Sequence, residues 1–149
     1  MRPGDYAYVM DEIAPALEAQ KAAGKFRLIG ITETPPNDPR QVMMTRAVHD
    51  PVWEVAMVAF HLMHQLPRRL VFPTTQTNGQ GTLIMFAVRS IFSRPDRLRT
   101  AMDALAAQGA VPATFAGRDD PLAKLVEQAG ANSLTEFAYR FARREAGVD

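Results

Sequence analysis

The sequence predicts an α/β fold built on three parallel strands. Three short, mainly apolar runs occur at residues 26–31, 55–60 and 82–88. Each run has the length and composition of a strand buried within a sheet rather than of a helix. The runs are separated by connections long enough to hold a helix, and not by hairpin turns. Consecutive strands joined in this way lie parallel to one another.

A helix is expected before the first strand. Asp5 can cap a helix that begins at Tyr6, and Gly24 ends it just before the strand. Pro15 interrupts this helix, because proline lacks the N–H that a helix interior needs. We therefore expect either a kink or a new start with Pro15 in the first turn.

The later helices are predicted from the residues that begin them. A Ser or Asp side chain before a proline or an apolar stripe accepts hydrogen bonds from the first free N–H groups of a helix. Ser133 and Glu136 have the spacing of a capping box. The sequence contains four residues that can begin a helix in this way: Asp38 before a helix at 40–48, Ser93, Asp120 and Ser133. Residues 65–78 show no clear helix or strand pattern, which allows one or two helical turns.

Composition limits the kinds of function. The 149 residues are 47% hydrophobic, which suits a single domain with a sizeable core. Seventeen basic and 16 acidic residues give a net charge of +1, so neither nucleic acid nor an anionic membrane is expected as a partner. The chain has no cysteine, signal-like N-terminus or apolar run of about 18 residues. A cytoplasmic location is therefore expected.

The strand segments, in their order, resemble the second half of the sequence of aldo/keto reductase family members. The resemblance implies a partial TIM (β/α)8 barrel, with residues 1–149 as a single incomplete domain, because a complete barrel takes about 250 residues. Residues 147–149 look like the approach to an eighth strand. The similar segments are GKFRLIGITE (24–33, fifth strand), VAMVAFHLMH (55–64, sixth), GTLIMFAVRS (81–90, seventh) and SLTEFAYRFARREAGVD (133–149, the helix before the eighth).

The resemblance implies that NADP, or NAD, binds across the carboxyl ends of the strands. Thr32 takes the place of a family serine that contacts the nicotinamide carboxamide. Glu33 replaces the usual neighbouring asparagine, and Met57 stands where the family has a glutamine for the same amide. All three are assigned to the cofactor by position, and two of them depart from the family pattern.

Three further residues are assigned to the cofactor by the same resemblance. Phe86 falls where an aromatic ring stacks on the nicotinamide, although without the family match it would be read as ordinary core. Arg89 and Arg94 lie in the loop that approaches the pyrophosphate, although arginines also suit the outer side of a polar helix.

The family chemistry implied is hydride transfer to a carbonyl substrate, with a tyrosine as proton donor supported by lysine, aspartate and histidine. The first half of the family barrel supplies all four, and this chain has no matching position. Tyr6, Tyr8 and Tyr139 fall in helices, and Lys21 and Lys25 precede the first strand. No catalytic residue is therefore assigned, and the chain is expected to be inactive alone.

His61 and His64 follow the second strand at a spacing of three residues. A metal site would need a third ligand, and no nearby carboxylate has suitable spacing. We therefore assign no metal, and interpret the pair as lining a pocket or a loop.

Two other interpretations of the whole chain remain open. One is a non-catalytic nucleotide-binding or protein-interaction module of the α/β class, and the other is an unrelated α/β domain with its own small-molecule site. Open strand edges predict either pairing with a missing N-terminal half or self-association. The reductase interpretation further implies a truncated gene product or one half of a split enzyme.

Overall fold

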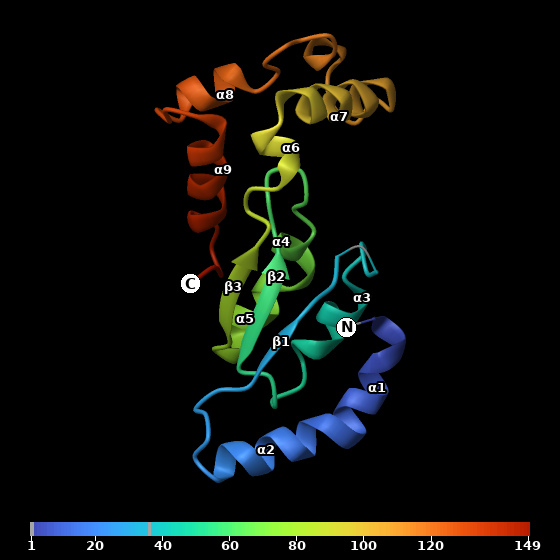
Figure 1. Cartoon of the computed structure of the whole chain (residues 1–149), viewed down its shortest axis with the longest axis vertical. Helices are drawn as coiled ribbons and strands as arrows, with labels where there is room; N and C mark the ends of the chain where they lie inside the picture. The colour runs from blue at the N-terminus through green and yellow to red at the C-terminus, as the bar shows by residue number, and fades with distance from the viewer. Residues whose placement is uncertain (1, 36) are drawn as a thin grey trace.

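A computed structural model describes residues 2–35 and 37–149 and contains a parallel three-stranded sheet (Figure 1). The strand order follows the chain, and Thr32, Met57 and Leu83 lie opposite one another across the sheet. The predicted α/β class with three parallel strands is therefore confirmed. The strands are β1 (Gly30–Thr32), β2 (Val55–Ala59) and β3 (Gly81–Met85).

Two strands differ in extent from the prediction. β1 begins only at Gly30, because the carbonyl of Ile29 accepts N–H groups from both Glu54 (2.8 Å) and Val55 (3.2 Å) before the regular ladder starts. β3 ends at Met85 and not at residue 88. Phe86 has φ 64°, and this left-handed backbone turns the chain out of the extended conformation.

One helical path precedes β1 and runs beneath the sheet in Figure 1. Pro15 lies in the first turn of α2, directly after a π-helical segment, so the predicted new start at this proline is confirmed. The predicted Asp5 cap is wrong, because its carboxylate accepts from the N–H of Arg2 at 3.2 Å. The path comprises η1 (Pro3–Asp5), α1 (Tyr6–Tyr8), η2 (Val9–Ile13) and α2 (Ala14–Ala22).

The two faces of the sheet differ in burial. Ile31, Ala56 and Val58 point to the face that packs on the connecting helices, and all are buried. On the opposite face, 38% of Met57 and 47% of Leu83 remain exposed. Figure 1 shows the strands in front of α5, with the second face toward the viewer. The connecting helices are α3 (Val42–Ala47), α4 (Pro67–Leu70) and α5 (Phe72–Asn78).

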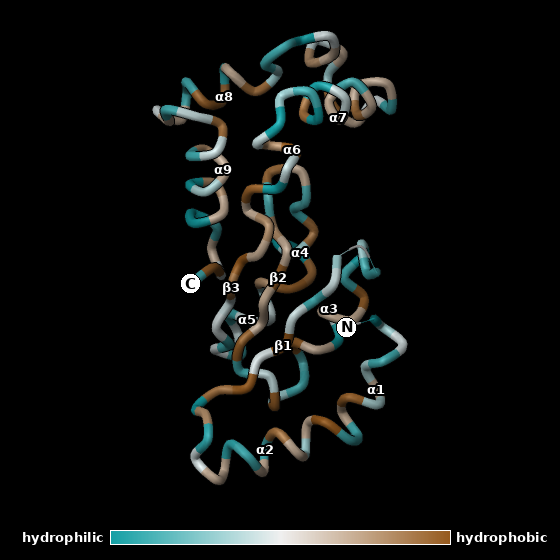
Figure 2. Tube along the Cα trace, viewed as in Figure 1, coloured by the Kyte–Doolittle hydropathy of each residue, from teal (hydrophilic) through white to brown (hydrophobic). Residues whose placement is uncertain are grey.

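A second group of helices lies beyond the carboxyl ends of β2 and β3. It has its own apolar cluster, which includes Phe92, Leu98 and Met102. In Figure 2 the hydrophilic turns of α9 point away from α6 and the more apolar ones toward it. The group comprises α6 (Ser90–Ser93), α7 (Pro95–Ala107), η3 (Ala113–Phe115), α8 (Ala123–Gln128) and α9 (Leu134–Arg143).

The structure confirms that Asp38 and Ser133 accept the first free N–H groups of their helices, and it corrects the other two caps. The helix after Asp38 spans residues 42–47 and not 40–48, and Gln41 immediately precedes it. Asp38 accepts the N–H groups of residues 42 and 43 at 2.9 and 2.7 Å, and Ser133 accepts that of Glu136 at 3.1 Å. Ser93 does not cap α7, because it is the last residue of α6 and Arg94 precedes α7. The helix expected after Asp120 begins two residues later than its proline, at residue 123.

The end of the chain lies beside the outer edge of β3. The N–H of Asp149 donates to the carbonyl of Thr82 at 3.2 Å, and the Thr82 N–H donates to Asp149 Oδ2 at 2.6 Å. Asp149 thus reaches the edge of the sheet, and whether residues 147–149 lead into an eighth strand stays a prediction.

Candidate functional site

The candidate site is the end of the sheet where the three parallel strands finish. Thr32 and Met57 lie directly opposite each other on β1 and β2. Both belong to the exposed face of the sheet, so neither is committed to the core. The Thr32 hydroxyl makes a long hydrogen bond of 3.4 Å to the carbonyl of Glu33. The structure therefore brings together two residues that the sequence assigns to the same amide.

Glu33 has a different position from its neighbour. Its side chain is 3% exposed, and its carboxylate accepts hydrogen bonds from the Ala59 N–H and from Gln41 Nε2, at 3.0 and 3.2 Å for the two oxygens. Burial raises the pKa of Glu33 to about 7, and the Asp38 charge adds to the rise, although both hydrogen bonds oppose it. The carboxyl joins the ends of β1 and β2 to the start of α3, and does not face the exposed side of the sheet.

The partner of Glu33 is itself unusual. Gln41 is fully buried, has φ 55°, and immediately precedes α3. Its Oε1 atom is buried and has no hydrogen-bond partner among the residues that the structure describes. A buried acceptor without a donor costs about 1–3 kcal/mol.

Phe86 and Arg89 form a stacked pair just beyond β3. The Arg89 Cζ atom lies 4.6 Å from the centroid of the Phe86 ring, and 40% of Phe86 is exposed. A bulky residue at φ 64° is strained by about 1–3 kcal/mol, and such strain is concentrated at functional sites. The structure thus presents an aromatic surface and a cation at the same strand end.

Arg94 is directed elsewhere. Its Nη2 atom lies 3.4 Å from Asp96 Oδ2, and this neighbour lowers the pKa of the Asp96 carboxyl. Both side chains are exposed at the start of α7. The arginine is accordingly held at a helix end and is not stacked with the pair at the end of β3.

His61 and His64 occupy a tight turn after β2. The His64 N–H donates to the His61 carbonyl at 2.8 Å, the reverse bond measures 3.2 Å, and the ring centroids are 5.7 Å apart. Burial lowers the pKa of His61 to about 4 and also lowers that of His64, and the charge of Arg89 contributes to both shifts. Sequence spacing drew attention to the two histidines, but their proximity to Arg89 depends on the packing of two strand ends.

Tyr6 and Lys21, two of the residues considered as substitutes for a proton donor, lie away from this end. The Tyr6 hydroxyl donates to Asp50 Oδ2 at 2.5 Å and accepts from Trp53 Nε1 at 2.8 Å, and burial raises its pKa. Lys21 pairs with Glu54, which immediately precedes β2. Both contacts are at the amino ends of the strands, which is the position that the sequence predicts for Lys21.

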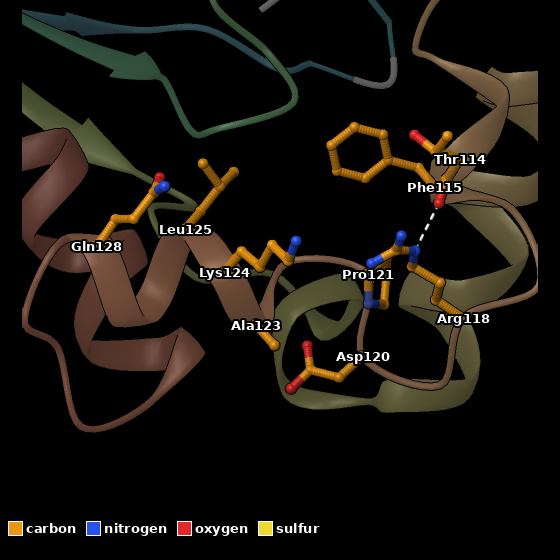
Figure 3. Close-up of a pocket in the computed structure, with 9 residues that line it drawn as sticks. All are labelled: Thr114, Phe115, Arg118, Asp120, Pro121, Ala123, Lys124, Leu125 and Gln128. Carbon is orange, nitrogen blue, oxygen red and sulfur yellow. Dashed lines mark hydrogen bonds between the residues drawn. The ribbon is translucent and has the colours of Figure 1, made fainter.

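The structure also contains hollows that the sequence did not predict. One, of about 290 Å³, lies between η3 and α8 and is lined by Phe115, Arg118, Lys124 and Leu125 among others (Figure 3). The Arg118 Nε donates to the carbonyl of Thr114 at 2.5 Å. Two others, of about 530 and 680 Å³, adjoin the amino ends of β2 and β3. These hollows do not include the residues gathered at the carboxyl ends.

Comparisons with known proteins supply no neighbour for this site. No protein-family model matches the sequence, and neither the curated proteins nor the solved structures give a match. Within residues 2–35 and 37–149, no three His, Asp or Glu side chains are grouped so as to hold a metal ion. None of the helices in the same ranges has both the length and the apolar character needed to cross a membrane.

Proposed function

We propose that this chain is the C-terminal portion of an aldo/keto reductase-like, NAD(P)H-dependent oxidoreductase, and that its three strands are part of a (β/α)8 barrel. The supporting observation for the fold is the difference between the two sheet faces. In a barrel, helices cover the outer face while the inner face packs against the other strands. Here α3, α4 and α5 lie against one face, whereas Met57 and Leu83 are exposed on the other.

The observation that carries the cofactor proposal is the arrangement at the carboxyl ends of the strands. Thr32 and Met57 lie side by side, and the Phe86 ring stands at the next strand end with Arg89 stacked on it. In the proposed complex Thr32 holds the carboxamide of NADP or NAD, Phe86 stacks on the nicotinamide ring, and Arg89 approaches the phosphates. Ligands of parallel α/β proteins bind at this end of the sheet.

The buried hydrogen bonds of Glu33 reduce the number of residues proposed to contact the cofactor. Glu33 was assigned to the cofactor by position, but its carboxylate is enclosed by Gln41 and the Ala59 N–H. In the proposed site Glu33 therefore fixes the end of β1 while Thr32 contacts the ligand. Arg94 is retained only as a residue of the phosphate-side loop, because its guanidinium pairs with Asp96.

The proposed reaction is reduction of a small carbonyl compound. The dinucleotide held by Thr32 and Phe86 would supply the hydride for the carbonyl carbon, and a group from the other part of the barrel would supply the proton for the carbonyl oxygen. This chain contributes cofactor binding and orientation. It is expected to give no turnover by itself.

A fluorescence titration with NADPH tests the proposal. Saturable binding is expected, and Phe86→Ala or Thr32→Ala should each weaken it about tenfold, since the loss of one stacking or charge-neutral hydrogen-bond contact costs about 1 kcal/mol or more. Phe115→Ala is the matched control, because Phe115 lines the hollow of Figure 3. Absence of binding, or weakening by the control alone, would overturn the cofactor proposal.

A second candidate, a protein-interaction module, is favoured by the exposed apolar face of the sheet. Parallel sheets are normally covered on both faces, and exposed apolar surface promotes association. The partner would be a missing N-terminal half or a second copy of the chain. Light scattering over a range of concentrations tests self-association, and Leu83→Lys should abolish it if this face is used. A monomer at all concentrations would exclude self-association through the sheet.

A further inference from the structure

The carboxyl ends of β2 and β3 carry a group of basic side chains, here called the basic cluster: His61, His64 and Arg89. The two histidines come from the turn after β2, and the arginine follows β3. The two histidines are three residues apart in one turn, whereas Arg89 comes from a different strand end.

One face of the Arg89 guanidinium packs on an aromatic ring, and the N–H groups along the edge of the guanidinium remain free. The flat group stacks on Phe86 at 4.6 Å, a contact that uses the face of the ion. Arg89 is exposed, and its side chain makes no ion pair or hydrogen bond with any residue in the ranges 2–35 and 37–149. Its N–H donors thus remain available in the fork geometry that matches an oxyanion.

The histidines present a second set of donors. The Met63 N–H donates to His61 Nδ1 at 3.3 Å, so the neutral imidazole carries its hydrogen on Nε2. The His61 ring is also held edge-on against Phe92, with centroids 5.6 Å apart. His64 Nε2 is buried and has no hydrogen-bond partner in the part of the chain that the structure describes.

Within residues 2–35 and 37–149, no acidic group contributes to the pKa shift of either histidine. Arg89 acts on both imidazoles and His64 acts on His61, while α6 contributes the aromatic ring of Phe92. The strand-end carboxyl of Glu33 is directed to Gln41 and Ala59. The His61 ring packs against Phe92, and the Phe92 N–H donates to the Arg89 carbonyl at 2.8 Å. Three basic side chains with unfilled hydrogen-bonding capacity therefore lie at two neighbouring strand ends.

We propose that the basic cluster binds a single oxyanion group, either a phosphoryl group or a carboxylate. Arg89 supplies the permanent charge, and His61 and His64 supply hydrogen bonds whose strength increases when the imidazoles take up a proton. The site rests on the proposed function only for the source of the oxyanion. That source is a phosphate of the dinucleotide or the carboxylate of an acidic carbonyl substrate.

Proton NMR of the three histidines tests the proposal, because His49 provides an internal control at the exposed end of α3. Inorganic phosphate and acetate are titrated separately at constant ionic strength near pH 6. Saturable shifts of the His61 and His64 ring protons, with His49 unchanged, are expected. Binding should also raise the pKa of both imidazoles, so that affinity increases as the pH falls.

Two arginine variants distinguish specific binding of the anion at the basic cluster from non-specific attraction to the positive charge of the protein. Arg89→Gln should weaken binding of the anion at least tenfold, since a charge-assisted contact contributes about 1.5–3 kcal/mol. Arg69→Gln, which removes an exposed arginine of α4, should have no effect. Equal shifts at all three histidines, no saturable shift, or equal losses in the two variants would overturn the proposal.

Competition between NADPH and the small anions identifies the source of the oxyanion. It also tests the anion site separately from the cofactor site. Phosphate binding that NADPH displaces assigns the site to the dinucleotide. Acetate binding that persists with NADPH bound assigns it to the substrate. If the anions bind but NADPH does not, the basic cluster stands and the cofactor proposal fails. If NADPH binds and neither anion perturbs the cluster, the present inference fails alone.

Discussion

Glu33 gives a quantitative test of the strand-end geometry. The carboxyl is 3% exposed, and its pKa is raised from 4.5 to about 7. The folded protein therefore binds a proton more tightly than the unfolded chain. Each tenfold difference in proton affinity is worth about 1.4 kcal/mol, so deprotonation costs the fold about 3 kcal/mol. This contribution to stability is fully present below pH 4.5 and is lost as the pH rises through about 7.

The variant Glu33→Gln imitates the protonated side chain. Its amide oxygen can still accept the Ala59 N–H. Its new N–H group meets Gln41, whose amide must turn over so that the unpartnered Oε1 takes the place of Nε2 and accepts it. Above about pH 7.5 the variant should be more stable than the wild type, by at most about 3 kcal/mol. The difference should shrink as the pH approaches 4.5 and reach zero below it, where the wild-type carboxyl is itself protonated in both states.

Urea unfolding at a series of pH values measures this difference. Comparison of variant with wild type is needed because His61, whose pKa is lowered, changes the wild-type curve in the opposite sense over part of the same range. Glu127→Gln, on the exposed surface of α8, is the control and should track the wild type. If Glu33→Gln is less stable than the wild type by the same amount at about pH 8 and at about pH 5, the pKa of Glu33 is not raised by burial.

Three further changes test neighbouring features. Phe86→Gly should leave the free energy of unfolding unchanged or raise it by about 1 kcal/mol, because glycine relieves the strained backbone at this position. Phe72→Ala, in the core, should lower the free energy of unfolding by about 3–5 kcal/mol. Equal losses of stability in the two variants would contradict the strain at Phe86. Asp38→Ala should cost about 1–2 kcal/mol in urea unfolding by removing two N–H acceptors at α3, and a neutral result would exclude the cap. The stability of the wild type relative to His61→Asn should fall as the pH drops from 6.5 to about 4, and a constant difference would show that the imidazole is not buried.

The repeating strand and helix pattern was readable from the sequence because it depends on local hydrophobicity and on turn residues. Alternating apolar runs and helix-sized connections were enough to predict β2 and the parallel order of all three strands. Pro15, Asp38 and Ser133 act through their own backbone or the next turn, so their effects could also be predicted. Ser93 could not be placed correctly, because tertiary packing added a separate short helix before α7.

The properties of the site depended on contacts between distant segments. Glu33 could be placed at a strand end, but its burial requires Gln41 from the next loop and Ala59 from another strand. The strained backbone of Phe86 has no signal in a run of apolar residues. The association of Arg89 with the histidines likewise joins two strand ends, which sequence spacing cannot show.

Backbone NMR of the labelled chain during an NADPH titration tests, residue by residue, the proposed binding of a nicotinamide dinucleotide at the carboxyl ends of the strands. Saturable shifts are expected at residues 31–33, 57–61 and 85–89, while the signals of residues 114–128 around the hollow of Figure 3 should stay unchanged. Shifts confined to residues 114–128, or no saturable shifts at all, would contradict it.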